Sequence, residues 1–256
     1  MQINSLRIAA LGVLLAAAPL PAAFAHDLWL VPTRDGTELN AVLNFGDPGK
    51  RDMPVLQRLY EVNLVSASGT VPLRDAGKFT ESKVFGFPVL ISPTFPKPTD
   101  DTIMTARYDN GFWVKTPNGM RNVTQRLVPG AKDTFWVGKF SKTLFGPGAY
   151  KILAGHEIEL IPLEDPFLLP PGQKLHVRLI LRGKPVTDAE VRTETGLTLV
   201  ADKDVPQYPT GPDGVAAVPL PLHGPWVIAV EYKTKGEFPA TAATDQFNVT
   251  LAFTLK

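Results

Sequence analysis

The chain has 256 residues, of which 26 are Lys or Arg and 25 are Asp or Glu, so its net charge is +1 with neutral histidines. This even balance argues against nucleic acid and anionic membranes as partners, because both bind proteins through an excess of basic charge. The chain has no cysteine, which excludes disulfides and thiolate metal ligands. Any metal must therefore be held by nitrogen and oxygen, in a protein long enough for one large or two small domains.

The first 25 residues have the three regions of a secretory signal peptide. Arg7 precedes an apolar run from Ile8 to Leu20, and Ala23 and Ala25 then supply the small residues of a cleavage site. The run is short for a membrane span of about 20 residues, so we favour cleavage over the alternative of an uncleaved anchor. We predict a periplasmic protein whose mature chain begins at His26, with no stable membrane insertion after cleavage.

The 256-residue chain contains 25 Pro and 21 Gly, a high number of turn-forming residues, so short β-strands are expected. The expected elements are Leu28 to Val31, ending at Pro32; Thr37 to Phe45; Leu56 to Ser66, as a short helix or a strand; a hairpin of Thr102 to Tyr108 and Phe112 to Val114 around Asn110-Gly111; Lys132 to Leu144, where helix and strand compete; and Tyr150 to Ile161.

The last third of the chain alternates apolar and polar residues most regularly. Leu175, Val177, Leu179 and Leu181 share one face, and Phe247 to Leu255 repeats the pattern. Proline-rich segments around residue 165 separate this part from the rest. We therefore predict an all-β protein of two immunoglobulin-like or transthyretin-like β-sandwich domains, covering residues 26–165 and 166–256 after a signal peptide of residues 1–25.

Two resemblances follow from the order of short motifs. Gly183 to Val191, Thr210 to Gly214 and Gly224 to Ile228 resemble the transthyretin-like and carboxypeptidase-regulatory-like sandwich, which specifies a fold more than a function. Together with Ala25 to Leu30, Phe140 to Leu144 and Gly155 to Leu163, they make nearly the whole mature chain similar to a periplasmic domain-of-unknown-function family associated with nickel and cobalt uptake. That family includes the NikK-like periplasmic component of ECF nickel transporters.

Cleavage after Ala25 would make His26 a chelator, because its freed α-amine and its ring Nδ1 can bind one ion together. A second imidazole would complete a three-nitrogen set suited to Ni(II) or Cu(II). His156 is the first candidate and His223 the second, although a hydrogen-bonded core histidine and a turn histidine explain them as well. Asp27 could add an oxygen ligand, whereas His176 is expected at the surface.

The function predicted from these features is divalent-metal binding, with Ni(II) or Co(II) favoured through the resemblance and Cu(II) as the alternative. The metal would be supplied to a membrane metal transporter. An enzyme is not predicted, because the chain has no Gly-x-Ser-x-Gly, phosphate-binding glycine loop or His-Glu-x-x-His motif. Two alternatives stay open: a metal-free adhesion or carbohydrate-binding module, and, more remotely, a copper-dependent polysaccharide oxygenase.

Overall fold

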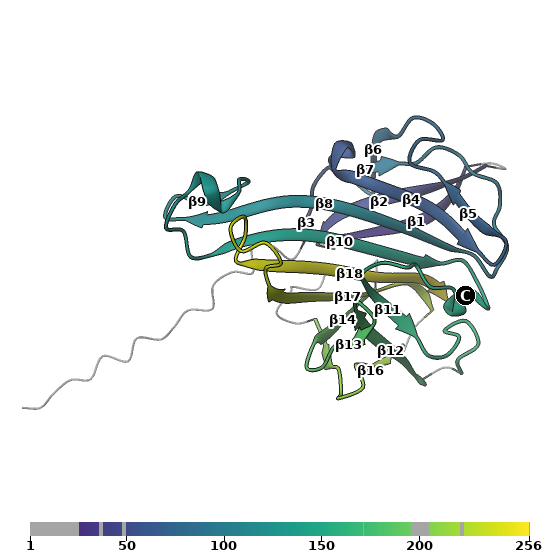
Figure 1. Ribbon diagram of the computed structural model, residues 1–256. Coiled ribbons are helices and arrows are strands. Elements are labelled where there is room, and N and C mark those ends of the chain that lie inside the picture. The colour runs from purple at the N-terminus through teal and green to yellow at the C-terminus, as the bar shows by residue number, and fades with distance from the viewer. Residues whose placement is uncertain are drawn as a thin grey trace, which may run out of the picture.

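The computed structural model describes residues 26–35, 38–47, 50–170, 172–195, 205–220 and 223–255. These residues fold into three β-sheets of five, nine and four strands, which confirms the predicted all-β sandwich class. Figure 1 shows the nine-stranded sheet in the middle, with the five-stranded sheet on one face and the four-stranded sheet on the other. The predicted signal peptide, residues 1–25, lies outside the described part. Within the described ranges, no helix is long and apolar enough to cross a membrane.

The five-stranded sheet, which we name the N-terminal sheet, has the order β1-β2-β7-β6, with β3 also paired to β2. Its strands are β1 (Asp27–Asp35), β2 (Glu38–Asp47), β3 (Lys50–Arg51), β6 (Thr80–Val84) and β7 (Phe87–Ile91). Strand β1 continues through Pro32, where the sequence predicted an end. Proline is tolerated there because β1 is the edge strand of this sheet.

The nine-stranded sheet, the central sheet, has the order β15-β14-β17-β18-β10-β8-β4-β5, with β9 paired to β8. Its strands are β4 (Leu59–Ser66), β5 (Gly69–Pro72), β8 (Ile103–Thr116), β9 (Gly119–Arg121), β10 (Thr134–Leu144), β14 (Glu190–Thr195), β15 (Gln207–Pro209), β17 (Gly224–Lys235) and β18 (Thr244–Leu255). Strands β10 and β18 pair in parallel. The sheet therefore continues across the boundary placed at residue 165.

The four-stranded sheet, the C-terminal sheet, has the order β11-β12-β13, with β16 also paired to β12. Its strands are β11 (Ile158–Pro162), β12 (Lys174–Leu181), β13 (Lys184–Pro185) and β16 (Val215–Pro219). Three single-turn 3-10 helices complete the described elements: η1 (Leu56–Arg58), η2 (Gln125–Leu127) and η3 (Ala149–Lys151). The predicted choice between helix and strand at Leu56 to Ser66 resolves as η1 followed directly by β4.

Two hydrophobic cores lie on opposite faces of the central sheet. Met104 and Tyr108 of β8 pack with Leu43 of β2 in the core under the N-terminal sheet. Ile103 of β8 and Phe140 of β10 pack in the core that the C-terminal sheet covers. Successive residues of a strand point to opposite faces, so the alternation seen in the sequence places each side chain in one core or the other.

The hairpin predicted around Asn110-Gly111 was wrong. Strand β8 runs through both residues, and the pairing with β10 shifts between Val137 and Gly138. Gly111 has a φ of +82°, so the glycine accommodates a β-bulge in one long strand instead of a reversal of the chain. The turn comes later, between Thr116 and Gly119, where β8 pairs with β9.

The strand predicted for Tyr150 to Ile161 was wrong in its first half. The segment begins in η3, continues as an irregular loop and enters β11 only at Ile158. His156 therefore lies in a loop that precedes a strand. The competing interpretations of Lys132 to Leu144 resolve as strand β10, which is buried on both faces.

Candidate metal centre

The start of β1 is fixed against the central sheet by three side chains. The Lys139 ammonium donates a hydrogen bond to the His26 carbonyl oxygen. The Thr250 hydroxyl donates to the Leu28 carbonyl at 2.6 Å, and the Thr143 hydroxyl donates to the Leu30 carbonyl at 2.9 Å. These alternate carbonyls lie on the edge of β1 that faces away from β2, so side chains of β10 and β18 replace the missing neighbouring strand. His26 consequently has a defined position.

The His26 ring lies between an aromatic ring and two carboxylates. It stacks on Phe45 with 5.7 Å between ring centroids and 22° between planes. Asp47 Oδ2 is 3.8 Å from Nδ1, and Asp52 Oδ2 is 3.7 Å from Nε2. Nδ1 itself is buried and has no hydrogen-bond partner. A buried ring nitrogen without a hydrogen-bond partner is uncommon in folded proteins.

The electrostatic surroundings keep the His26 ring neutral. Burial is the main cause that lowers its pKa from the ordinary 6.5, and the Lys139 ammonium acts in the same direction. Lys139 is fully buried, and burial lowers its own pKa to about 8 against the attraction of the Asp27 carboxylate. Neutral imidazole is the form that binds metals. The ring is therefore ready to act as a ligand at neutral pH.

Asp27 does not join His26, because its carboxylate is held in a separate buried network. Arg192 Nη2 donates to Asp27 Oδ2 at 2.7 Å, and Asn248 Nδ2 donates to Asp27 Oδ1 at 3.2 Å. Burial raises the pKa of Asp27, and the Arg192 guanidinium opposes that rise. The side chain of Asp27 belongs to the face of β1 opposite to that of His26. The structure thus gives Asp27 an ion-pair partner in place of the predicted ligand role.

His156 is also separated from His26, by the whole thickness of the central sheet. Its Nε2 lies 3.2 Å from Glu61 Oε1, and its ring centroid is 5.5 Å from that of Phe140. Phe140 follows Lys139 on β10, and the two side chains point to opposite faces. Lys139 contacts His26 on one face, so His156 lies beneath the other. His156 therefore matches the alternative given in the sequence analysis, a hydrogen-bonded histidine.

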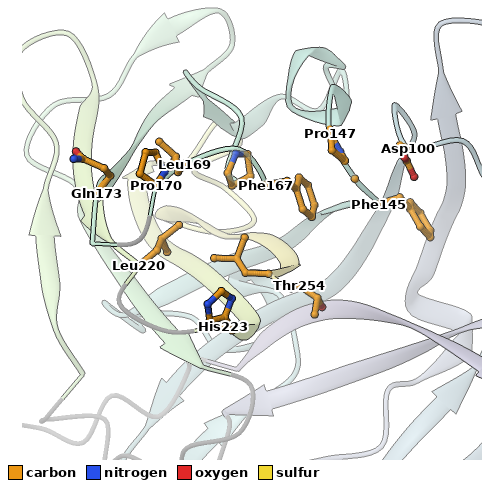
Figure 2. A pocket seen from close by; sticks show the side chains of 13 residues that line it. Asp100, Phe145, Pro147, Phe167, Leu169, Pro170, Gln173, Leu220, His223 and Thr254 are labelled. Carbon is orange, nitrogen blue, oxygen red and sulfur yellow. The ribbon is translucent and has the colours of Figure 1, made fainter.

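His223 lies at the far end of β18. It precedes Gly224, which pairs with Leu255, whereas Lys139 at the His26 end pairs with Asn248. Seven residues of strand correspond to roughly 23 Å. His223 and Asp100 both line a pocket of about 430 Å³. Figure 2 shows the Phe145 ring beside Asp100 and the Phe167 ring nearer to His223. His223 thus has no part in a centre at His26.

The fourth histidine, His176, behaves as predicted for a surface residue, with Nδ1 2.9 Å from Glu164 Oε1 and a side chain 49% exposed. All four histidines lie in the described part of the chain, and His26 is the one with two carboxylates beside its ring. The described residues hold no ready group of three His, Cys, Asp or Glu ligands. This agrees with the geometry, because Asp47 and Asp52 lie beside different nitrogens of the His26 ring. An ion bound between Nδ1 and Asp47 would therefore need its third donor from another group.

Sequence reasoning missed Asp47, Asp52 and Lys139. Asp47 is the last residue of β2 and Asp52 directly follows β3, and these two strands pair beside Gly46, whose φ is +129°. A Cβ at Gly46 would lie 2.8 Å from the Arg51 Cα, so only glycine allows β3 to fold back this closely. The signal available in the sequence was Gly46-Asp47-Pro48-Gly49, which predicted a loop without indicating that Asp47 and Asp52 lie beside His26.

Residues 23–234 match the family described as Domain of unknown function (DUF4198). The chain belongs to this family. No curated protein matches it. Among solved structures, it is similar to the titin domains Z1Z2 in complex with telethonin, at 12% identity and a TM-score of 0.18, over 91% of this chain and 95% of the other. A similarity this low supports no argument about the DUF4198 protein's fold or function.

Proposed function

We propose that this protein, once exported and cleaved before His26, binds a divalent metal ion and supplies it to a membrane uptake system. The α-amine and Nδ1 of His26 would chelate the ion, and the Asp47 carboxylate would add the third ligand. The observation that carries the proposal is the buried Nδ1 of His26, which has no hydrogen-bond partner and lies 3.8 Å from Asp47 Oδ2.

The distances fit one shared ion. Ligand nitrogens and oxygens lie about 2.1 Å from a first-row divalent metal, so two donors 3.8 Å apart can contact the same ion with little movement. Two nitrogens and a carboxylate oxygen suit Ni(II), Co(II) and Cu(II), with Cu(II) bound most tightly by the Irving–Williams order. We favour Ni(II) or Co(II) as the transported metal because of the family resemblance, and Cu(II) is the alternative.

The site suits transfer of a metal better than permanent storage. The His26 side chain is 25% exposed and that of its proposed co-ligand Asp47 is 23% exposed, so the proposed ligand residues are not sealed inside the protein. Few protein ligands hold the ion, which leaves coordination positions for an incoming ligand from the transporter. The polysaccharide oxygenase considered from the sequence would need a second imidazole beside His26, and the other three histidines lie elsewhere. We therefore do not propose that activity.

Calorimetric titration of Ni(II), Co(II) and Cu(II) into protein with an authentic His26 terminus tests the proposal. One extra alanine before His26 should weaken binding by about two orders of magnitude, because one of two linked donors is lost. His26→Ala should have a similar effect, and Asp47→Asn should cost about tenfold. His156→Ala and His176→Ala are matched controls that should change nothing.

The terminus itself is the decisive element in that experiment. Unchanged affinity in the extended protein would refute chelation by the amine, and unchanged affinity in His26→Ala would refute the site altogether. Loss of binding in His156→Ala alone would instead return the centre to the other face of the central sheet. Because burial lowers the pKa of His26, protons should compete with metal at the ring only at lower pH than for an exposed histidine.

A further inference from the structure

An apolar groove lies in the angle between the N-terminal and central sheets. Strand β1 stands with its edge on the central sheet, through the bonds from Thr143 and Thr250. One side of this contact is filled by the core around Leu28 and Leu43. The other side holds a groove of about 480 Å³, whose floor is formed by Trp29 and its neighbours Val31, Val227 and Ala252. This volume is typical of sites for small molecules.

A strained aromatic residue stands at the groove. Phe85 lines it with a side chain that is 89% exposed and a φ of +52°. Phe85 and Gly86 form the two-residue turn between β6 and β7, since Val84 pairs with Phe87. Both turn residues have positive φ, a conformation for which Asn-Gly is the preferred pair. The Phe85 ring is thus exposed to water, and its backbone has a conformation that is unfavourable for phenylalanine. Contact with a ligand gives a reason for both.

The groove carries one kind of charge. Arg51 is the single charged residue among the residues that line it, all of which are described. Its guanidinium lies 5.0 Å from the Trp29 ring centroid and 4.4 Å from that of Phe87. Nη1 also donates to Asn44 Oδ1 at 2.9 Å, so the cation is held in place at the groove wall. A pocket with apolar walls and one fixed cation is complementary to an apolar molecule with one negative group.

We propose that this groove binds a small apolar monoanion, such as a medium-chain or aromatic carboxylate. The alkyl or aromatic part would lie on Trp29, Val31 and Val227 under the Phe85 ring. The carboxylate would accept hydrogen bonds from the Arg51 guanidinium. This site is separate from the His26 centre, since Trp29 points to the face of β1 opposite to His26. The proposal does not depend on metal binding.

Three probes with the same ten-carbon chain test the charge preference: decanoate, decanol and decylamine. Binding is measured by calorimetry and by the fluorescence change of Trp29 and Trp226, which both line the groove. EDTA is present throughout, so the outcome is independent of the proposed metal function. Decanoate should bind about tenfold or more tightly than decylamine, as expected for a charge-assisted hydrogen bond in a partly buried site.

Four variants separate this proposal from non-specific binding. Arg51→Met should abolish the preference for decanoate, and Thr33→Trp, at an exposed lining position, should block all three probes. Phe85→Asn should raise the melting temperature, because asparagine suits the turn, yet weaken decanoate binding about threefold or more. Leu168→Ser, at a residue that is 71% exposed and outside the groove, is the control. It should change neither the melting temperature nor the affinity for decanoate.

Specific results would overturn the proposal. They are equal affinity for the three probes, no binding of any of them, or full binding by Thr33→Trp. A Phe85→Asn variant that gains stability and keeps its affinity would also count against it, because the strained ring would then serve no ligand. A folded Thr33→Trp variant is verified by its unchanged melting temperature, which makes a loss of binding attributable to the groove.

Discussion

Replacing Lys139 with methionine should remove an unusual rise of stability with pH. The Lys139 side chain is completely buried, and its ammonium donates to the His26 carbonyl. Burial lowers its pKa from 10.5 in the ordinary state to about 8 in the folded protein. A group whose pKa is lower in the folded state binds fewer protons there than in the unfolded chain. The free energy of unfolding therefore increases as the pH rises between these two values.

The magnitude follows from the two pKa values. The difference between 10.5 and about 8 is worth about 3 kcal/mol over the whole interval, at about 1.4 kcal/mol per pH unit. About 2 kcal/mol of this should be gained between about pH 7.5 and about pH 9.5. Measurements should stop there, because burial raises the pKa of Tyr108. Above its ordinary value of about 10, that tyrosine makes stability fall with pH.

Urea titrations followed by tryptophan fluorescence, in EDTA and at several pH values, measure the effect. The difference in unfolding free energy between wild type and Lys139→Met should change by about 2 kcal/mol over this window. For the control Lys235→Met, at an exposed position of β17, the free energy of unfolding should change with pH as it does for wild type. If Lys139→Met also ran parallel to wild type, the ammonium would not be desolvated, and the electrostatic account of the His26 surroundings would fail.

Three further outcomes are expected. Glu159→Leu should lower the free energy of unfolding by about 3–5 kcal/mol, because it leaves the buried Lys142 ammonium without the carboxylate 2.7 Å away. Adding Lys142→Met to the same chain should restore most of this stability. A double variant that is no more stable in urea than Glu159→Leu alone would contradict this reasoning. Gly214→Ala should cost about 2 kcal/mol or more, since φ is +75° and the new Cβ would lie 2.8 Å from the Leu179 carbonyl oxygen. Gly183→Ala, with φ of +77° and no atom within 4 Å, should cost only about 1 kcal/mol, so equal melting temperatures would refute the role of the close contact. Nickel at about 100 times its Kd should add about 2.7 kcal/mol to the stability of cleaved protein, and EDTA should reverse that gain unless the metal binds the unfolded chain equally well.

Local patterns predicted the strands well where one face meets a core. Alternation in Leu175 to Leu181 predicted β12, whose Leu175, Val177 and Leu179 are buried. The same reasoning failed at Asn110-Gly111, because a glycine with positive φ serves a bulge as readily as a turn. Whether the chain reverses there depends on β10, the strand that lies alongside. Polar strand β6 was missed since all but one of its residues are exposed, so no apolar alternation marks it.

The sequence by itself determined the all-β class, most of the buried faces and the histidine that a predicted cleavage would place at the terminus. These depend on period-two patterns and on neighbouring residues, which are local properties. The tertiary structure decided which groups meet. Parallel pairing of β10 with β18 joins distant parts of the chain, and the fold of β2 and β3 brings Asp47 and Asp52 to His26. Lys139 and Phe140 point to opposite faces, which separates His26 from His156. Sheet stacking and strand register set those contacts, and neither is encoded in any single segment.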